Sequence, residues 1–208
     1  MKSTVLNVLL TCVVLSACSQ PKVFNDRQVG DGCEDCELMF AGIPSTIISW
    51  KTKLAADNEP GEPLIISGTI FKNDGKTPAS DVILYVYQTD NTGRYTPAPN
   101  QVHAKRHGHL RGWIKTDEQG KYEFRTIRPA AYPNRNDPQH IHPIIKEPGL
   151  SYYWIDDFVF EDDPLLTDQL KKKFDERGGS GVIKLKKNEK KAWIGKRDII
   201  LGLNIPNY

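Results

Sequence analysis

The chain contains 208 residues, of which 26% are charged and 38% hydrophobic, a composition typical of a folded protein rather than a disordered one. Its formal net charge is only +2, which argues against an electrostatic nucleic-acid binder. No apolar run reaches the ~18 residues that a membrane-spanning helix needs, and the four cysteines are too few for a fold built from disulfides.

A secretory signal is predicted at the start of the chain. Met1 and Lys2 give a positive start, and the apolar run over residues 5–15 is too short to span a bilayer. Residues 15–18 read Leu-Ser-Ala-Cys and resemble a bacterial lipobox, so residues 1–17 are predicted to be a lipoprotein signal peptide, with lipidation on Cys18. An ordinary cleaved signal is the alternative. We therefore expect a lipoprotein of the bacterial cell envelope that meets the membrane only through its N-terminal lipid.

Residues 18–60 are polar and rich in turn-forming residues, and they predict an irregular leader that lies on the main domain. The leader contains Cys33 and Cys36 in a CxxC spacing, which also occurs in redox sites and in half of a zinc site. No second CxxC follows, and the acidic neighbours Glu34 and Asp35 would raise a thiol pKa. A local structural disulfide is the preferred interpretation, because disulfides persist outside the cytoplasm.

From residue 61 onward the pattern predicts one β-rich domain. Runs of β-branched and aromatic residues, separated by turns with Gly and Pro, predict about eight strands. The strands are expected at residues 64–71, 82–89, 112–116, 121–126, 140–146, 152–160, 181–187 and 192–203. Residues 117–120 (Asp-Glu-Gln-Gly) predict a hairpin between two of them. The expected fold is all-β, an antiparallel β-sandwich over residues 61–208.

One short helix is predicted over residues 167–177. Thr167 is a candidate N-cap, and Leu170 and Phe174 lie on the same face. Gly178 and Gly179 are expected to end the helix.

Two histidine pairs carry the spacing that can place metal ligands. His140 and His142 begin a predicted strand, so their side chains point to one face and Ile141 points to the other. On its own this pattern fits two exposed polar residues equally well. His107 and His109 have the same spacing but lie in a segment rich in Gly, Lys and Arg, which favours a surface loop.

The segments around the first pair resemble the intradiol ring-cleavage dioxygenases, the protocatechuate and catechol dioxygenase family. The resemblance is carried by residues 92–97 (TGRYTP), residues 120–129 (GKYEFRTIRP), Tyr132-Pro133 and His140-Ile141-His142. It extends over roughly residues 60–166.

This resemblance implies a non-haem Fe(III) held by Tyr95, Tyr132, His140 and His142. Phenolate is a hard anionic oxygen donor and suits the ferric ion. The implied reaction uses O2 to cleave a catecholic ring between its two hydroxyl-bearing carbons, which gives a muconate-type diacid. In the family the tyrosinate at the position of Tyr132 also serves as a base. Family members often assemble, so a homo-oligomer is a further expectation.

Two departures from the family pattern put the substrate and the activity in question. The larger enzymes carry an arginine three residues before the first histidine, where this chain has Asp137, and Arg135 is the substitute candidate. They carry a glutamine where Asp157 falls. The alternatives are therefore a transthyretin-like β-sandwich that acts as a binding module, and a homologue that binds iron without turnover.

Overall fold

The computed structural model describes residues 26–45 and 49–208. The predicted signal peptide and Cys18 lie outside these residues. Within the described ranges, no helix combines the length and the apolar character that crossing a membrane requires.

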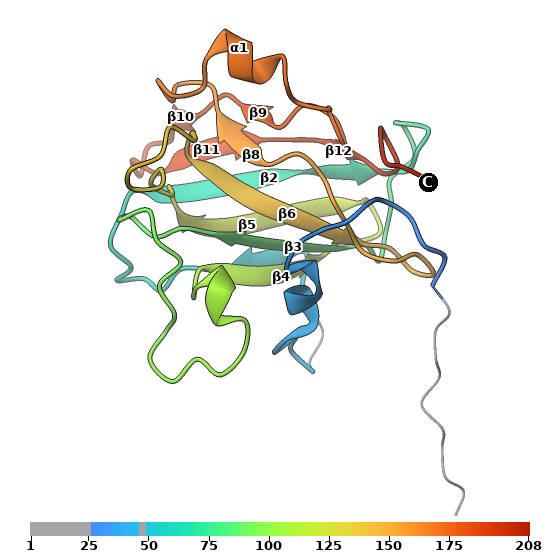
Figure 1. Cartoon of the computed structure of the whole chain (residues 1–208), viewed down its shortest axis with the longest axis horizontal. Helices are drawn as coiled ribbons and strands as arrows, with labels where there is room; N and C mark the ends of the chain where they lie inside the picture. The colour runs from blue at the N-terminus through green and yellow to red at the C-terminus, as the bar shows by residue number, and fades with distance from the viewer. Residues whose placement is uncertain (1–25, 46–48) are drawn as a thin grey trace, which may run out of the picture.

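The strands of the described residues form two six-stranded sheets that face each other (Figure 1). The first sheet has the order β1 (Lys51–Lys53), β5 (Lys121–Ile127), β2 (Pro63–Phe71), β11 (Trp193–Lys196) and β10 (Lys186–Lys187), with β12 (Ile199–Ile200) paired to β2. The second sheet has the order β4 (Arg111–Lys115), β3 (Ile83–Gln88), β6 (His140–Lys146), β8 (Phe158–Phe160) and β9 (Val182–Ile183), with β7 (Tyr153–Trp154) paired to β6.

The prediction of a purely antiparallel sandwich of about eight strands is wrong in two respects. Both sheets are mixed, because β1 pairs with β5, β11 and β12 with β2, and β8 with β9 in parallel. Three predicted strands are also divided. Residues 181–187 leave the second sheet at β9 and enter the first at β10. The last strand breaks near Arg197, whose buried guanidinium turns inward and donates to the carbonyl oxygens of Asp156 and Gly179.

The hairpin predicted at residues 117–120 does not form. The turn itself is present, and the Asp117 carboxylate accepts from the backbone N–H groups of Gln119 and Lys121 at 3.0 and 2.8 Å. Its two flanking strands diverge, however, because β4 pairs with β3 and β5 pairs with β2. The turn therefore connects the two sheets instead of joining neighbouring strands.

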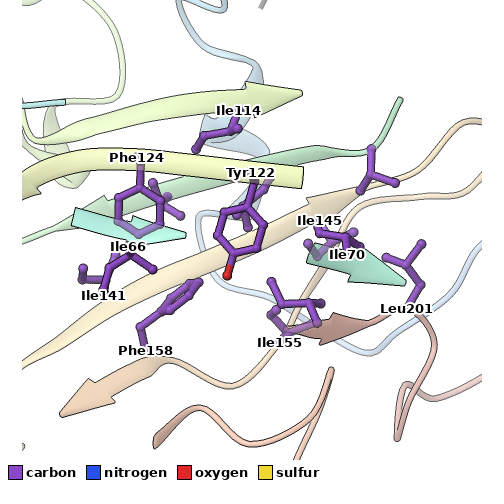
Figure 2. Packing of buried hydrophobic residues seen from close by; sticks show 14 of the residues in the cluster. Ile66, Ile70, Ile114, Tyr122, Phe124, Ile141, Ile145, Ile155, Phe158 and Leu201 are labelled. Atoms are coloured by element: carbon purple, nitrogen blue, oxygen red, sulfur yellow. The ribbon is translucent and has the colours of Figure 1, made fainter. Parts of the chain in front are cut away.

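The core lies between the sheets and comes from alternate residues of each strand (Figure 2). In β2 the even-numbered residues Leu64 and Ile66 are fully buried, as period-two alternation requires. Phe124 of the first sheet and Phe158 of the second meet edge to face, with ring centres 5.7 Å apart. Ile141 of β6 also enters this core. The packing leaves the opposite face of β6 free to carry polar side chains.

The helix is shorter than predicted. It covers only α1 (Asp168–Lys171), although Thr167 is its N-cap and accepts from the backbone N–H of Leu170 at 3.2 Å. Beyond it, Arg177 turns inward, stacks its guanidinium 3.4 Å from the ring centre of Trp154 and pairs with Asp31 at 2.7 Å. These contacts bury Arg177, and residues 172–177 form turns and irregular backbone rather than a helix.

The leader is an integral part of the fold. Its 3-10 helix η1 (Cys36–Phe40) lies on the outer face of the second sheet, and β1 adds a strand to the first sheet. Cys33 and Cys36 are joined in a disulfide, with Cα atoms 5.5 Å apart. A second apolar cluster forms beneath η1 from Cys36, Met39, Tyr85, Trp113 and Ile144. The leader therefore covers the sheet face that also carries the histidine pair.

Candidate metal centre

Four side chains from three segments converge at one end of the second sheet. His140 and His142 lie on the outer face of β6, opposite the buried Ile141. Tyr95 comes from the loop after β3, and Tyr132 comes from the loop between β5 and β6. The sheet thus fixes the two imidazoles, while loops position the two phenols.

The four donor atoms lie within bonding reach of a common point. The Oη atoms of Tyr95 and Tyr132 are 2.5 Å apart, and the Nε2 atoms of His140 and His142 are 3.2 Å apart. The Nε2 of His142 lies 2.9 Å from the Oη of Tyr95 and 3.3 Å from that of Tyr132. The Nε2 of His140 lies 3.1 Å from the Oη of Tyr132.

The second nitrogen of each imidazole assigns its tautomer. The Nδ1 of His140 lies 2.6 Å from the carbonyl oxygen of Pro138, and the Nδ1 of His142 lies 2.8 Å from a carboxylate oxygen of Asp157. Both partners accept hydrogen bonds, so each Nδ1 carries a proton, and in the neutral ring the Nε2 then presents a lone pair. Two lone pairs that face each other at 3.2 Å repel, and a cation between them would remove this repulsion. The donor set therefore fits a metal ion.

Asp157 contacts the candidate ligand His142 and does not itself join the four donor atoms. Asp157, His140 and His142 could form a two-histidine, one-carboxylate site by distance alone. The carboxylate instead binds Nδ1, on the side of the His142 ring away from the two phenols. This is the arrangement in which a carboxylate orients a metal-binding histidine and raises its basicity.

Burial determines the protonation states around the centre. It lowers the pKa of His140, with a further contribution from His142, and this keeps the imidazole neutral. Burial raises the pKa of Tyr132, and burial together with the Tyr132 phenol raises that of Tyr95. Both phenols therefore stay protonated unless a cation stabilises the phenolate form. For Asp157, burial alone would raise the carboxyl pKa, but His142, His140 and Arg197 together outweigh burial and lower the pKa.

A cleft of about 670 Å³ opens beside the four donors. Three of the four donor residues, Tyr132, His140 and His142, line this cleft. The lining also includes Cys33 and Cys36 of the leader, Arg135, Trp154, Leu170 and Phe174.

Arg135 lies on the wall of this cleft but does not reach the donor cluster. Its Nε pairs with Asp137 at 2.5 Å, and its guanidinium lies 5.3 Å from the ring centre of Tyr132. Its side chain is 67% exposed. Arg135 and Asp137, the two residues that the sequence analysis considered for the family's arginine position, thus form an ion pair beside Tyr132.

The expectation that residues 107–109 form a surface loop is wrong for His107. Its ring is buried and stacks on Tyr87 with ring centres 3.7 Å apart, and its Nδ1 is 2.9 Å from the hydroxyl of Tyr85. The ring is buried because it packs against two tyrosines of β3. Its hydrophilic sequence neighbours gave no sign of this burial.

Sequence reasoning also missed Tyr87. Tyr87 pairs with His142 across β3 and β6, and the two rings stack with centres 4.7 Å apart. The available signal was its place on a predicted strand, but the register with β6 depends on tertiary pairing that periodicity does not reveal.

Comparisons with known proteins identify relatives of this chain. A family model described as "Dioxygenase" matches residues 45–192, more than half of the chain. The chain is 28% identical over 151 residues to catechol 1,2-dioxygenase 2 of Acinetobacter lwoffii, covering 59% of this chain and 52% of the relative. It is 33% identical over 125 residues to the protocatechuate 3,4-dioxygenase beta chain of Burkholderia cepacia, covering 56% and 53%.

The chain therefore belongs to the dioxygenase family. Within that family its relatives place it among the intradiol ring-cleavage dioxygenases, as the sequence motifs predicted. The chain spans about half the length of these two curated relatives.

Solved structures show the same fold. The dioxygenase domain of a dioxygenase and carbohydrate-binding fusion from Streptomyces sp. SirexAA-E matches with a TM-score of 0.56 and 23% identity, covering 82% of this chain and 96% of that one. The 3-chlorocatechol 1,2-dioxygenase of Rhodococcus opacus 1CP matches with a TM-score of 0.56 and 24% identity, covering 76% and 66%.

Proposed function

We propose that this protein is an Fe(III)-dependent dioxygenase that cleaves a catecholic ring with O2 between its two hydroxyl-bearing carbons and releases a muconate-type diacid. Family membership supports the reaction class. The convergence of two phenols and two imidazoles carries the proposal of ferric iron, because anionic oxygen donors favour that oxidation state. When bound, the ferric ion would supply Lewis acidity toward the catechol oxygens.

The residues of the chain divide the remaining work. Tyr132, but not Tyr95, is among the described residues that line the cleft, so Tyr132 is the phenolate that meets an incoming catechol. We assign to its Oη the acceptance of a proton from a substrate hydroxyl. Tyr95, His140 and His142 would complete the set of residues that hold the metal. We assign to Arg135, whose guanidinium lies 5.3 Å from the ring centre of Tyr132, the stabilisation of negative charge that develops on the substrate ring.

The decisive experiment combines iron content, colour and oxygen uptake. Protein loaded with ferric iron is expected to bind one iron per chain, to show a red-brown tyrosinate charge-transfer band, and to consume O2 with catechol. Tyr132→Phe is expected to shift and weaken that band. Tyr152→Phe, at a half-buried tyrosine that packs on Phe40, is the matched control and is expected to leave the band unchanged.

Each alternative has its own outcome in this experiment. A colourless protein that binds no iron would favour the transthyretin-like binding module. A coloured protein that consumes no O2 with any catechol would favour an iron-binding homologue without turnover. An unchanged band in Tyr132→Phe would contradict the assignment of Tyr132 as a donor.

We also propose that the protein is anchored to the bacterial cell envelope by a lipid on Cys18. The support is the Leu-Ser-Ala-Cys sequence of residues 15–18 behind an apolar run. Bacterial expression with labelled fatty acid is expected to label the wild-type chain and not Cys18→Ser. Equal labelling of the two chains would contradict the anchor.

A further inference from the structure

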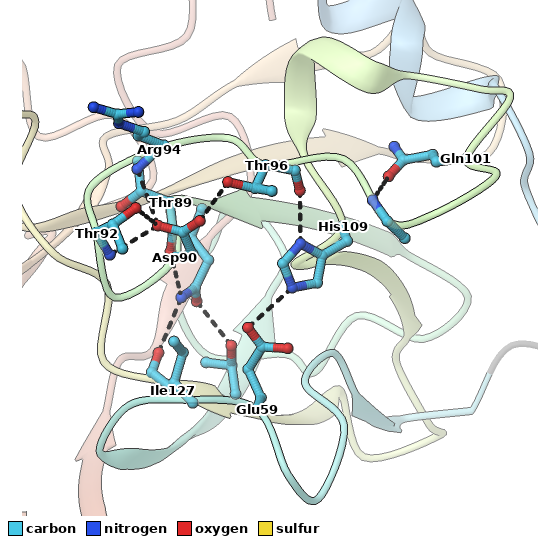
Figure 3. A network of polar contacts seen from close by, with 12 residues as sticks. Glu59, Thr89, Asp90, Thr92, Arg94, Thr96, Gln101, His109 and Ile127 are labelled. Carbon is cyan, nitrogen blue, oxygen red and sulfur yellow. Dashed lines mark hydrogen bonds and ion pairs between the residues drawn. The ribbon is translucent and has the colours of Figure 1, made fainter.

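The loop that carries Tyr95 is organised by one buried carboxylate, that of Asp90 (Figure 3). Its Oδ1 accepts from the backbone N–H and the hydroxyl of Thr92 at 2.8 and 2.6 Å, and from the backbone N–H of Arg94 at 3.2 Å. Its Oδ2 accepts from the hydroxyl of Thr96 at 2.6 Å. Arg94 and Thr96 are the two neighbours of Tyr95, so the carboxylate grips the chain on both sides of that tyrosine.

The same residue holds the loop that carries Tyr132. The carbonyl oxygen of Asp90 accepts from the backbone N–H of Ala130 at 3.1 Å. The hydroxyl of the preceding Thr89 donates to the carbonyl oxygen of Ala130 at 2.7 Å. Ala130 lies two residues before Tyr132, so both of its backbone polar groups are bonded to the two residues that follow β3.

The two loops are also in direct contact. Gly93 has a φ of +77°, and a Cβ atom there would lie 2.1 Å from the carbonyl oxygen of Ala131 and 2.9 Å from the Cδ of Pro133. These two residues flank Tyr132. Only glycine permits this approach, because any side chain would push the loops apart.

From these contacts we propose that Asp90 is a positioning residue that sets the separation of the two phenol donors, Tyr95 and Tyr132, for the metal. The inference rests on the proposed function. Asp90 touches neither phenol, yet its carboxylate connects to the residues on both sides of Tyr95, and its backbone carbonyl oxygen accepts from the N–H of Ala130, two residues before Tyr132. The 2.5 Å separation of the two Oη atoms is the geometry that it maintains.

The chain offers a matched control in Asp74. Its carboxylate builds a similar turn, accepting from the backbone N–H groups of Lys76 and Thr77 at 2.9 and 2.8 Å and from the Thr77 hydroxyl at 2.6 Å. This turn follows β2 and carries none of the four donors. Asp74→Ala therefore removes a comparable set of hydrogen bonds without touching either tyrosine loop.

The test compares Asp90→Ala, Thr96→Val and Asp74→Ala in the full chain, by chelator competition for ferric iron and by the visible band. Asp90→Ala is expected to weaken iron binding by ~10–100-fold, the range seen when residues that orient metal ligands are removed, and to shift the band. Thr96→Val removes a single contact to Asp90, and it is expected to shift the band in the same direction by less. Asp74→Ala is expected to keep the wild-type affinity and band.

The outcomes separate this inference from the proposed function. If wild-type protein binds no iron, the proposed function fails and the inference fails with it. If wild-type protein binds iron and Asp90→Ala retains its affinity and band, only the inference fails. If Asp90→Ala does not fold, Thr96→Val decides, because a wild-type band in that variant overturns the role of the Asp90 contact.

Discussion

Removal of Asp157 should weaken iron binding without disturbing the fold. In the structure its carboxylate accepts from the Nδ1 of His142 at 2.8 Å, a short charge-assisted hydrogen bond. Loss of such an acceptor typically costs ~10–100-fold in metal affinity. The side chains of His142 and Asp157 are 26% and 36% exposed, so water can replace part of the lost bond. We therefore expect Asp157→Ala to fall near the lower end, at about 10-fold, which corresponds to about 1.4 kcal/mol.

The assay is chelator competition, followed by the visible band of the ferric protein. Asp157→Asn keeps an oxygen that can accept from Nδ1 and is expected to lose less affinity than Asp157→Ala. Asp175→Ala is the matched control, because it removes another carboxylate of the same cleft. Equal affinities for Asp157→Ala and Asp175→Ala would refute the orienting role of Asp157.

Three further predictions concern the core, a titrating pair and the leader. Phe124→Ala should lower the free energy of unfolding by ~3–5 kcal/mol in urea denaturation, because the ring is fully buried between the sheets, and a loss below about 1 kcal/mol would contradict that packing. Burial alone would lower the pKa of His109, but its bonds to the backbone and to Glu59 outweigh burial and raise it. The stabilisation by protonated His109 is then complete below the unfolded-state pKa of about 6.5, and it is lost as the pH rises through the folded-state pKa. The difference in unfolding free energy between wild type and His109→Gln should therefore shrink from about pH 6 to about pH 8. A constant difference would refute this linkage. Replacing both Cys33 and Cys36 by serine should cost about 2 kcal/mol or less and should raise the KM for catechol, because both residues line the cleft, while an unchanged KM would show that this wall does not touch the substrate.

Local periodicity accounts for what the sequence could predict. Strands β2 and β6 were placed within a residue because their side chains alternate between a buried and an open face. The same alternation placed His140 and His142 together on one face. The resemblance to the dioxygenases then added Tyr95 and Tyr132, whose loops carry no periodic signal of their own.

What could not be predicted depends on contacts between segments that are distant in sequence. The short α1 reflects the inward turn of Arg177 onto Trp154 and Asp31, and neither partner is near it in the chain. The burial of His107 depends on the two tyrosines of β3 that surround its ring. The parallel pairs of β11 and β12 arise because these late strands return to β2, which no local pattern encodes.

The leader determines where a functional fragment of this protein must begin. The family match begins at residue 45, yet Cys33 and Cys36 line the cleft and Met39 seals the outer face of the second sheet. A fragment cut at the edge of the match would keep all four donors and lose the part of the cleft that Cys33 and Cys36 line. It would also expose Tyr85 and Trp113 to water. Under the proposed function, a fragment chosen from the family match alone would keep its iron ligands but would hold a catechol less well.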